Sequence, residues 1–328
     1  MEVLVIVTYG MINLNYTMRM YNDYYPSYDE KILGKIRNKD GEIAIVPEDI
    51  IIIGENAFRD CRFLQYVFIP NNVKSINNGA FADCNSLQSI IIPDSVTNIG
   101  DSVFWQCESL QSVIIPNSVQ FLGSSVFNGC SSLKNVILSD NIKVIDSFAF
   151  EDCSSLERIY LPTNLLCIEV DAFRDCVSLG NIEIPQSVNR ICDSAFENCQ
   201  SLRTIRIPRG VRYIGHETFK GCCSLQSVII PNTVTKIKHG TFSGCSSIGG
   251  IDIPDSVTEI EFSAFEGCTS LKSIHYSSYK VDDMVIDELA FDDATIEECV
   301  LYVPYGTKEK YVNHPVLGKF KNIEIEEL

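Results

Sequence analysis

The sequence predicts a single β-rich α/β solenoid, a right-handed coil of short stacked repeats with one parallel main sheet. Three observations support this fold. A phenylalanine recurs ten times at a spacing of 23 residues, a cysteine follows each of them by three residues, and a proline keeps the same step in nine repeats, with Ser139 as the one replacement. The phenylalanines are Phe58, Phe81, Phe104, Phe127, Phe150, Phe173, Phe196, Phe219, Phe242 and Phe265. Such a fixed period is typical of repeat architectures.

Each repeat contains two extended pieces and one tight turn. In the run from Leu87 to Ile92 the apolar residues alternate at the end, as expected for a half-buried strand. Pro93 ends the pairing and turns the chain. A second short extended piece holds Val96 and Ile99. The Ala-Phe-x-x-Cys segment that follows is predicted to form a short helical or 3₁₀ turn.

One such unit cannot bury its own apolar face, so the units must stack. Stacked coils rise by about 4.8 Å each, which makes ten coils roughly 48 Å long. The Phe, Leu and Ile positions then form continuous internal columns. Handedness follows the usual rule for parallel crossovers.

The unit, with its AF-x-x-C-x-SL-x-x-I-x-IP core, resembles the BspA-like leucine-rich repeats of bacterial and protozoan surface antigens. The resemblance covers about residues 42–275, and the segment from Leu301 to Ile323 is similar to the terminal cap of that family. It implies a leucine-rich-repeat solenoid, display at the cell surface or secretion, and attachment to host or extracellular-matrix proteins.

Both ends depart from the repeat, as caps should. Residues 1–41 form a predicted N-terminal capping segment, in which the runs Val3–Tyr9 and Met11–Met20 around Gly10 suggest a hairpin over the first coil. Residues 42–275 hold ten repeats. Residues 276–328 form an irregular last coil and the C-terminal cap, since the next phenylalanine, Phe291, comes 26 residues after Phe265 rather than 23.

The net charge of −17 argues against nucleic acid and anionic membrane surfaces as partners, because both require a basic footprint.

The apolar run Val3–Val7 is too short for a signal core or a membrane span, and Glu2 stands where a signal peptide carries a basic residue. No membrane insertion is expected. A cytoplasmic location is therefore the alternative to the surface display that the resemblance implies.

Ten of the 14 cysteines occupy the repeat position, and the other four are Cys167, Cys192, Cys223 and Cys299. Disulfides between neighbouring coils would be within reach, but they would draw the coils together in pairs. A column of buried free thiols is the preferred interpretation. No C-x-x-C motif suggests a zinc site, and many free thiols suit a reducing environment.

The sequence contains no catalytic motif and implies neither an enzyme nor a cofactor. Asp193, His216 and His239 share one position on three adjacent coils, so they form a weak candidate for a metal site, against the simpler interpretation of a solvated edge. Acidic pairs recur every five residues from Asp282 to Glu298. Calcium binding would need these oxygens to converge, and a solvated irregular loop is preferred.

The candidate partner-binding site is an apolar strip on the outward face of the main sheet. The outward position of the first repeats carries Phe68, Ile91, Ile114, Ile137 and Tyr160, and then changes to charged residues; Tyr66 and Arg158 flank it. An exposed line of this kind marks an interaction site. Three explanations stay open: binding of a partner or self-association, covering by the N-terminal segment, and a β-propensity of isoleucine that carries no functional meaning.

These features favour a non-enzymatic module that binds a protein partner, acting in adhesion if the family resemblance extends to function. An intracellular scaffold or self-assembling structural protein is the alternative, which the free thiols and the missing export signal support.

Overall fold

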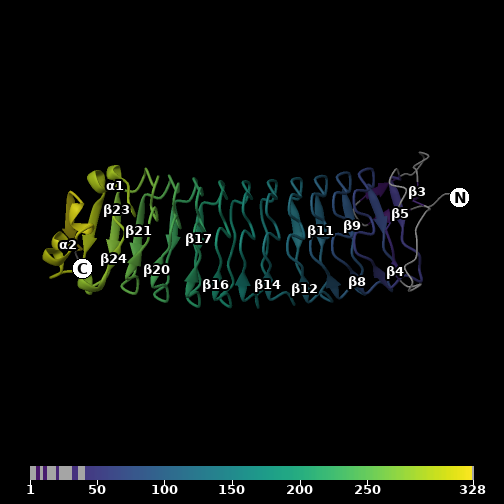
Figure 1. The fold of residues 1–328 in the computed structure, drawn as a ribbon, viewed down its shortest axis with the longest axis horizontal. Coiled ribbons are helices and arrows are strands. Elements are labelled where there is room, and N and C mark those ends of the chain that lie inside the picture. The colour runs from purple at the N-terminus through teal and green to yellow at the C-terminus, as the bar shows by residue number, and fades with distance from the viewer. Residues whose placement is uncertain (1–4, 8–9, 13–19, 22–31, 36–40, 327–328) are drawn as a thin grey trace.

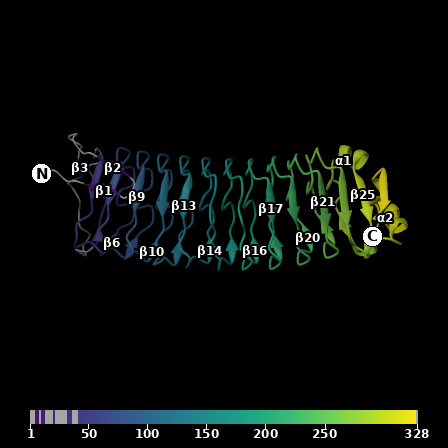
Figure 2. The ribbon, with the colours of Figure 1, turned by 180° about the vertical axis from the view of Figure 1, so that it is seen from behind.

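The computed structural model describes residues 5–7, 10–12, 20–21, 32–35 and 41–326, and over this part the chain forms one elongated parallel β-solenoid (Figures 1 and 2). The coils follow one another along the long axis in chain order, from the N-terminal end to the C-terminal end. Most coils contribute one strand to each of two sheet faces, so the apolar repeat positions stack on their own copies in adjacent coils.

The main face is built from the strands that, in the repeats, lie just before the proline position. They are β3 (Met20–Tyr21), β5 (Ile43–Ile45), β7 (Tyr66–Phe68), β9 (Ser89–Ile91), β11 (Ser112–Ile114), β13 (Asn135–Ile137), β17 (Thr204–Arg206), β19 (Ser227–Ile229), β21 (Gly250–Ile253), β23 (Ser273–Tyr276), β25 (Val300–Val303) and β26 (Asn322–Ile325). All pair in parallel, and within the repeats the register is offset by one repeat, as in the pair Val113 and Ile90.

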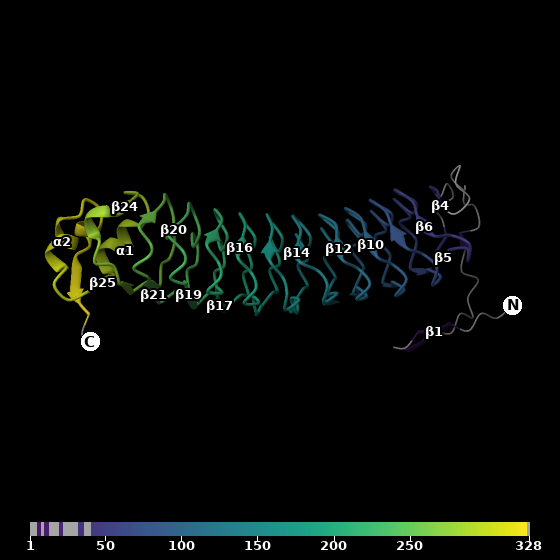
Figure 3. The same cartoon turned by 90° about the horizontal axis from the view of Figure 1, so that it is seen from below.

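The second face is built from two-residue strands, which are seen beside the first face in Figure 3. They are β4 (Ile32–Leu33), β6 (Ile52–Ile53), β8 (Ser75–Ile76), β10 (Asn98–Ile99), β12 (Phe121–Leu122), β14 (Val144–Ile145), β15 (Cys167–Ile168), β16 (Arg190–Ile191), β18 (Tyr213–Ile214), β20 (Lys236–Ile237), β22 (Glu259–Ile260) and β24 (Val285–Ile286). In most of them the first residue faces outward and the second is buried.

The Ala-Phe-x-x-Cys segments form successive turns instead of the predicted helical or 3₁₀ turn. In the coil around Phe81, Gly79 and Asp83 both adopt a left-handed backbone with φ of 61°. Their N–H groups, like that of Phe81, donate to carbonyls of the next coil at 2.8–2.9 Å. A helix would use these amides internally, so the turns exchange helical hydrogen bonds for bonds between coils.

The predicted columns are present in the core. The ten repeat phenylalanines stack face to face with centroids 5.0–5.7 Å apart, and Phe291 extends the stack beyond the last regular repeat at 5.2 Å from Phe265. The ten repeat cysteines are buried free thiols, which confirms the preferred interpretation. One continuous apolar cluster runs from Leu33 to Ile323.

Ser139 replaces the repeat proline without opening the core. Its side chain is fully buried, and its hydroxyl donates to the carbonyl oxygen of Val119 at 2.7 Å. Oγ of Ser139 also accepts the backbone N–H of Asn141 at 3.1 Å. The serine therefore closes the turn with hydrogen bonds where proline would close it by its fixed φ.

Stacking continues past both ends of the ten repeats. At the N-terminal side, β3 and β4 pair with β5 and β6 as a preceding coil. β1 (Val5–Val7) and β2 (Gly10–Ile12) pair antiparallel, in agreement with a hairpin, while the rest of the two predicted runs lies outside the described residues.

At the C-terminal side, the helices η1 (Val281–Asp283), α1 (Asp293–Glu298), α2 (Lys308–Asn313) and η2 (Leu317–Lys319) surround the last strands. Tyr311 of α2 is buried, and its hydroxyl donates to the carbonyl oxygen of Ser278 at 2.9 Å. The final coils are therefore closed by packed aromatic and apolar side chains.

Candidate protein-binding face

The outward position of the main face carries a line of exposed apolar side chains, named here the apolar strip. On β9 the alternation is clear, because Ile90 and Ile92 are buried while Ile91 between them is 61% exposed. The corresponding side chains on the next coils are equally open: Ile114 is 55% exposed, Ile137 is 59% and Tyr160 is 82%. A strand places alternate side chains on opposite faces, so burial of the repeat core leaves these side chains in solvent.

The strip residues are aligned across adjacent strands. Ile91 pairs with Ile114, Ile114 with Ile137, and Ile137 with Tyr160. Phe68 is half-buried and pairs with Ile45, which is 48% exposed.

Sequence reasoning began the strip at Phe68 and missed Ile45. The position of Ile45, two residues before Pro47, could have revealed it. The full line is therefore Ile45, Phe68, Ile91, Ile114, Ile137 and Tyr160.

Tyr66 and Arg158 lie beside the strip, two residues earlier in the repeat. Tyr66 is half-buried and its hydroxyl donates to Oε1 of Gln88 at 3.4 Å, whereas Arg158 is exposed. Arg158 and Tyr160 line an open hollow together with Asn181 and Glu183. At these two coils, regular strand pairing gives way to isolated bridges. The strip thus ends at an open depression with both polar and apolar lining residues.

No described residue covers the exposed side chains of Ile91, Ile114, Ile137 and Tyr160. Beyond Tyr160 the same outward position is occupied by Glu183, Arg206, Ile229, Asp252 and His275, so the apolar character is confined to the N-terminal half. Ile229 is 46% exposed and stands alone among charged neighbours.

Asp193, His216 and His239 lie on one edge, but their side chains have separate partners. Oδ1 of Asp193 accepts the backbone N–H of His216 at 2.9 Å. Nδ1 of His216 lies 3.6 Å from Glu261, and Nε2 of His239 lies 3.7 Å from Glu217. The two imidazole centroids are 6.4 Å apart.

The acidic pairs of residues 282–298 are likewise dispersed. Asp282 pairs with Lys310, Glu298 with Lys272, and Oδ2 of Asp292 accepts the N–H of Gly267 at 2.7 Å. Within the described ranges, neither these carboxylates nor the side chains of Asp193, His216 and His239 bring three potential ligand atoms within 4.8 Å of one another. Each carboxylate named here instead closes a local contact.

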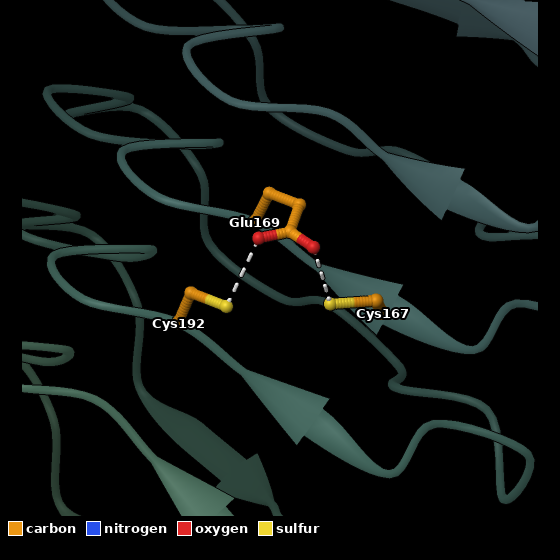
Figure 4. A group of neighbouring side chains, drawn as sticks. All are labelled: Cys167, Glu169 and Cys192. Atoms are coloured by element: carbon orange, nitrogen blue, oxygen red, sulfur yellow. Dashed lines mark hydrogen bonds between the residues drawn. The ribbon is translucent and has the colours of Figure 1, made fainter.

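Sequence reasoning missed a cluster on the second face, formed by Cys167, Glu169 and Cys192 (Figure 4). Glu169 accepts a hydrogen bond from each thiol, at 3.1 Å from Cys167 and 3.2 Å from Cys192. Nε of Arg190 donates to Cys167 at 3.2 Å, and its Nη2 donates to Glu169. In a solenoid with a period of 23, residues 23 and 25 apart share a face of adjacent coils, and this spacing could have revealed the cluster.

The cluster shifts the pKa values of its two thiols in opposite directions. Hydrogen bonding with Cys192 and then with Arg190 outweighs burial and lowers the pKa of Cys167. The same interaction with Cys167, together with burial, raises the pKa of Cys192. Burial acts to raise the pKa of Glu169, but its hydrogen bonds outweigh this and lower it. The repeat cysteines differ, because burial raises the pKa of thiols such as Cys107 and leaves them protonated.

Repeat architecture and core identify this molecule as a leucine-rich-repeat solenoid, a class of module that binds proteins. The model of the BspA type leucine-rich repeat region matches residues 51–180 and 167–297. The chain belongs to the BspA-type leucine-rich repeat family.

Solved structures agree with this family. A leucine-rich repeat protein from Bacteroides ovatus is 25% identical with a TM-score of 0.62, covering 90% of this chain and 88% of that one. A leucine-rich cell surface protein from Faecalibacterium prausnitzii is 27% identical with a TM-score of 0.51, covering 90% and 83%. The pneumococcal vaccine antigen PcpA, at 17% identity and a TM-score of 0.53 over 90% and 94%, shares the fold.

A comparison with curated protein sequences finds no match. The helices formed by the described residues are too short and too polar to span a bilayer.

Proposed function

We propose that this protein is a non-enzymatic binding module that recognises a protein partner through the apolar strip. The observation that carries the proposal is the alignment of Ile91, Ile114, Ile137 and Tyr160, which are all more than half exposed on a rigid sheet. Adjacent coils separate these side chains by about 4.8 Å, so the strip from Phe68 to Tyr160 is about 20 Å long. Such a patch loses unfavourable contact with water when a partner covers it.

The flanking polar groups would give the interface its orientation. Tyr160 and the guanidinium of Arg158 stand at one end, and both residue types are frequent anchors of protein interfaces. The negative net charge of the chain favours a partner with a basic rim around an apolar centre. The cell surface description of the Faecalibacterium prausnitzii structure supports surface display and adhesion to host or matrix proteins as the setting.

The test compares two charge substitutions at the same repeat position. Wild-type protein, Ile91→Lys/Ile114→Lys and the control Ile229→Lys are passed over immobilised extracellular-matrix proteins, and binding is measured by surface plasmon resonance. We expect the double variant to lose binding and Ile229→Lys to keep it, since Ile229 lies outside the strip. Equal binding by all three proteins would contradict a role for the strip.

Self-association is measured on the same samples by analytical ultracentrifugation. A dimer or higher oligomer that only Ile91→Lys/Ile114→Lys dissociates would replace adhesion by the alternative function, a self-assembling scaffold. A monomeric wild-type protein that binds a matrix protein would support the proposal over that alternative.

A further inference from the structure

Cys167 and Cys192 stand outside the cysteine column of the core. Cys167 opens β15, and Cys192 directly follows β16 on the neighbouring coil. In the other repeats, the position of Cys167 carries Ile52, Ser75, Asn98, Phe121, Val144, Arg190, Tyr213, Lys236 and Glu259, and that of Cys192 carries Gly, Asn, Asp, Glu or Lys. Packing of the repeat therefore requires a thiol at neither place. The two cysteines and Glu169 are a local departure from the repeat.

The hydrogen bonding of this pair also differs from that of the column. Column thiols such as Cys176 and Cys199 donate to a phenylalanine carbonyl of the preceding coil at 3.1–3.2 Å. Cys167 and Cys192 instead donate to the two carboxylate oxygens of Glu169, one each. Each of the three side chains offers one ligand atom, and these atoms lie within 4.8 Å of one another.

This spacing matches the size of a tetrahedral metal site. Zinc binds sulfur at about 2.3 Å and carboxylate oxygen at about 2.0 Å, so tetrahedral ligand atoms lie roughly 3.5–3.8 Å apart. The sulfur–oxygen distances of 3.1 and 3.2 Å are slightly shorter, as expected for hydrogen bonds at the same positions. A bound ion would draw the three ligand atoms, which now lie within 4.8 Å of one another, to these tetrahedral separations.

The sheet register argues against a disulfide between the two thiols. Cys167 pairs with Arg190, so Cys192 lies two residues further along the neighbouring coil, just past the end of β16. A strand spacing of about 4.8 Å and a rise of about 3.3 Å per residue place their Cα atoms about 8 Å apart. A disulfide requires less than about 7 Å. A metal ion bridges the longer distance that a disulfide cannot.

Charge balance supports the same ligand. With both thiols protonated, Arg190 balances the carboxylate of Glu169. When a divalent ion binds, each thiol releases its proton, and two thiolates with one carboxylate carry three negative charges. The ion and the guanidinium supply three positive charges, which makes the occupied site neutral. Arg190 also donates to Cys167 and Glu169, so it holds two ligands in orientation from outside the site.

We propose that Cys167, Glu169 and Cys192 form a binding site for a thiolate-preferring divalent metal ion, with zinc as its natural class. Two sulfur ligands select zinc over calcium or magnesium, which prefer oxygen. Three protein ligands leave the fourth tetrahedral position for water or an external group. Glu169 is 22% exposed in its side chain, which gives an ion access from solvent.

Cobalt(II) is the probe, because its thiolate complexes show sulfur-to-metal charge-transfer absorption that carboxylate and imidazole complexes lack. The reduced protein is titrated anaerobically. We expect one equivalent of Co²⁺ to develop this band and Zn²⁺ to displace it. Cys167→Ser and Cys192→Ser should abolish the band, and Glu169→Gln should weaken binding of Co²⁺. The matched control Cys223→Ser should leave the band unchanged, since Cys223 is exposed and lies at another repeat position.

A second measurement uses only the wild-type chain, so it does not depend on the folding of variants. Thiols are alkylated with and without Zn²⁺, and the modified peptides are identified by mass spectrometry. Zinc should slow the alkylation of Cys167 and Cys192 but leave that of Cys223 unchanged. Absence of the charge-transfer band, its persistence in Cys167→Ser/Cys192→Ser, or zinc protection that does not distinguish Cys223 would each overturn the proposal.

Discussion

The thiol of Cys107 donates a hydrogen bond to the carbonyl oxygen of Phe81, 3.2 Å away in the preceding coil. The same carbonyl accepts the backbone N–H of Cys84 at 3.2 Å. The carbonyls of Phe58 to Phe242 at this repeat position accept such a thiol bond and so link each turn to the next coil. The column cysteines combine this weak hydrogen bond with a small apolar volume, which explains why a thiol suits a fully buried position beside the stacked rings.

Replacement of a column thiol should destabilise the protein modestly. Cys107→Ala removes one buried sulfur and its hydrogen bond, so the free energy of unfolding should fall by about 1–2 kcal/mol. The exposed Cys223→Ala is the matched control and should stay within about 0.5 kcal/mol of wild type. Urea denaturation followed by circular dichroism measures both. Equal effects of the two substitutions would show that the column does not stabilise the stack.

The column thiols should also make the protein sensitive to alkali. Burial raises the pKa of Cys268 to about 12 from an ordinary value of 9.0, and burial raises that of Cys107 well above it. At pH values below the ordinary thiol pKa, the thiol keeps its proton in the folded and in the unfolded chain. The stability that the buried neutral thiol contributes is then fully present. Above that pKa the unfolded chain loses the proton while the folded chain keeps it, so stability falls with rising pH, by up to about 1.4 kcal/mol per pH unit for each such thiol.

The alkaline effect is measured as the urea midpoint from neutral pH to about pH 11 under reducing conditions. The wild-type midpoint should decline above the ordinary thiol pKa, and Cys268→Ala should decline less steeply because it has one buried thiol fewer. An identical slope in both proteins would assign the decline to groups outside the column.

The aromatic stack should stabilise the coils on either side of each ring. Phe173 is fully buried between Phe150 and Phe196, with ring centroids 5.3 and 5.4 Å away. Phe173→Ala should lower the free energy of unfolding by about 3–5 kcal/mol. Phe173→Leu, which keeps most of the volume, should cost about 1.5 kcal/mol.

Hydrogen exchange measures where this loss is felt. Because each coil contacts only its neighbours, protection in Phe173→Ala should fall most in the coils adjacent to the cavity. A uniform loss of protection along the whole chain would instead indicate that the solenoid unfolds as one unit.

The repeat frame could be predicted from the sequence because its period is constant. Phe58 and Phe265 stand in the same register with no insertion between them, and each core position stacks on its own copies in adjacent coils. Outward and inward positions follow from strand alternation, which places Ile91 outside and Ile90 inside. The turn around Phe81 differs from the predicted helical or 3₁₀ turn because its amides bond to the next coil, which the sequence does not reveal.

The cysteine and carboxylate cluster could not be recognised by familiar motif spacing. Metal motifs such as C-x-x-C describe ligands within one loop, whereas Cys167 and Cys192 are 25 residues apart and meet through stacking of two coils. Asp193 and His216 show the reverse, because their spacing suggests a metal site that their hydrogen bonds do not leave free to form. There the spacing of 23 places the residues together, but Asp193 is engaged by the backbone of the next coil. Spacing predicts proximity, while hydrogen-bond competition decides which groups remain available.

Lysine substitutions at two adjacent residues at the end of β11 should have different effects on stability, because one residue faces solvent and the other faces the core. Ile114 is 55% exposed on the apolar strip, and Ile115 is 1% exposed in the core. Ile114→Lys should change the thermal midpoint little, because surface substitutions alter stability by about 0.5 kcal/mol or less. Ile115→Lys buries an unpaired charge and should prevent folding or cost at least about 4 kcal/mol.

This comparison also distinguishes the explanations of the strip. If the N-terminal segment covered Ile114, lysine there would disrupt an internal contact, and the melting temperature would drop together with the protection of that segment in hydrogen exchange. If the strip binds a partner, Ile114→Lys should melt like the wild type alone but lose the stabilisation that the partner gives to the wild type, since a ligand stabilises only the state that binds it. If the isoleucines reflect strand propensity alone, the variant should retain both its stability and its partner.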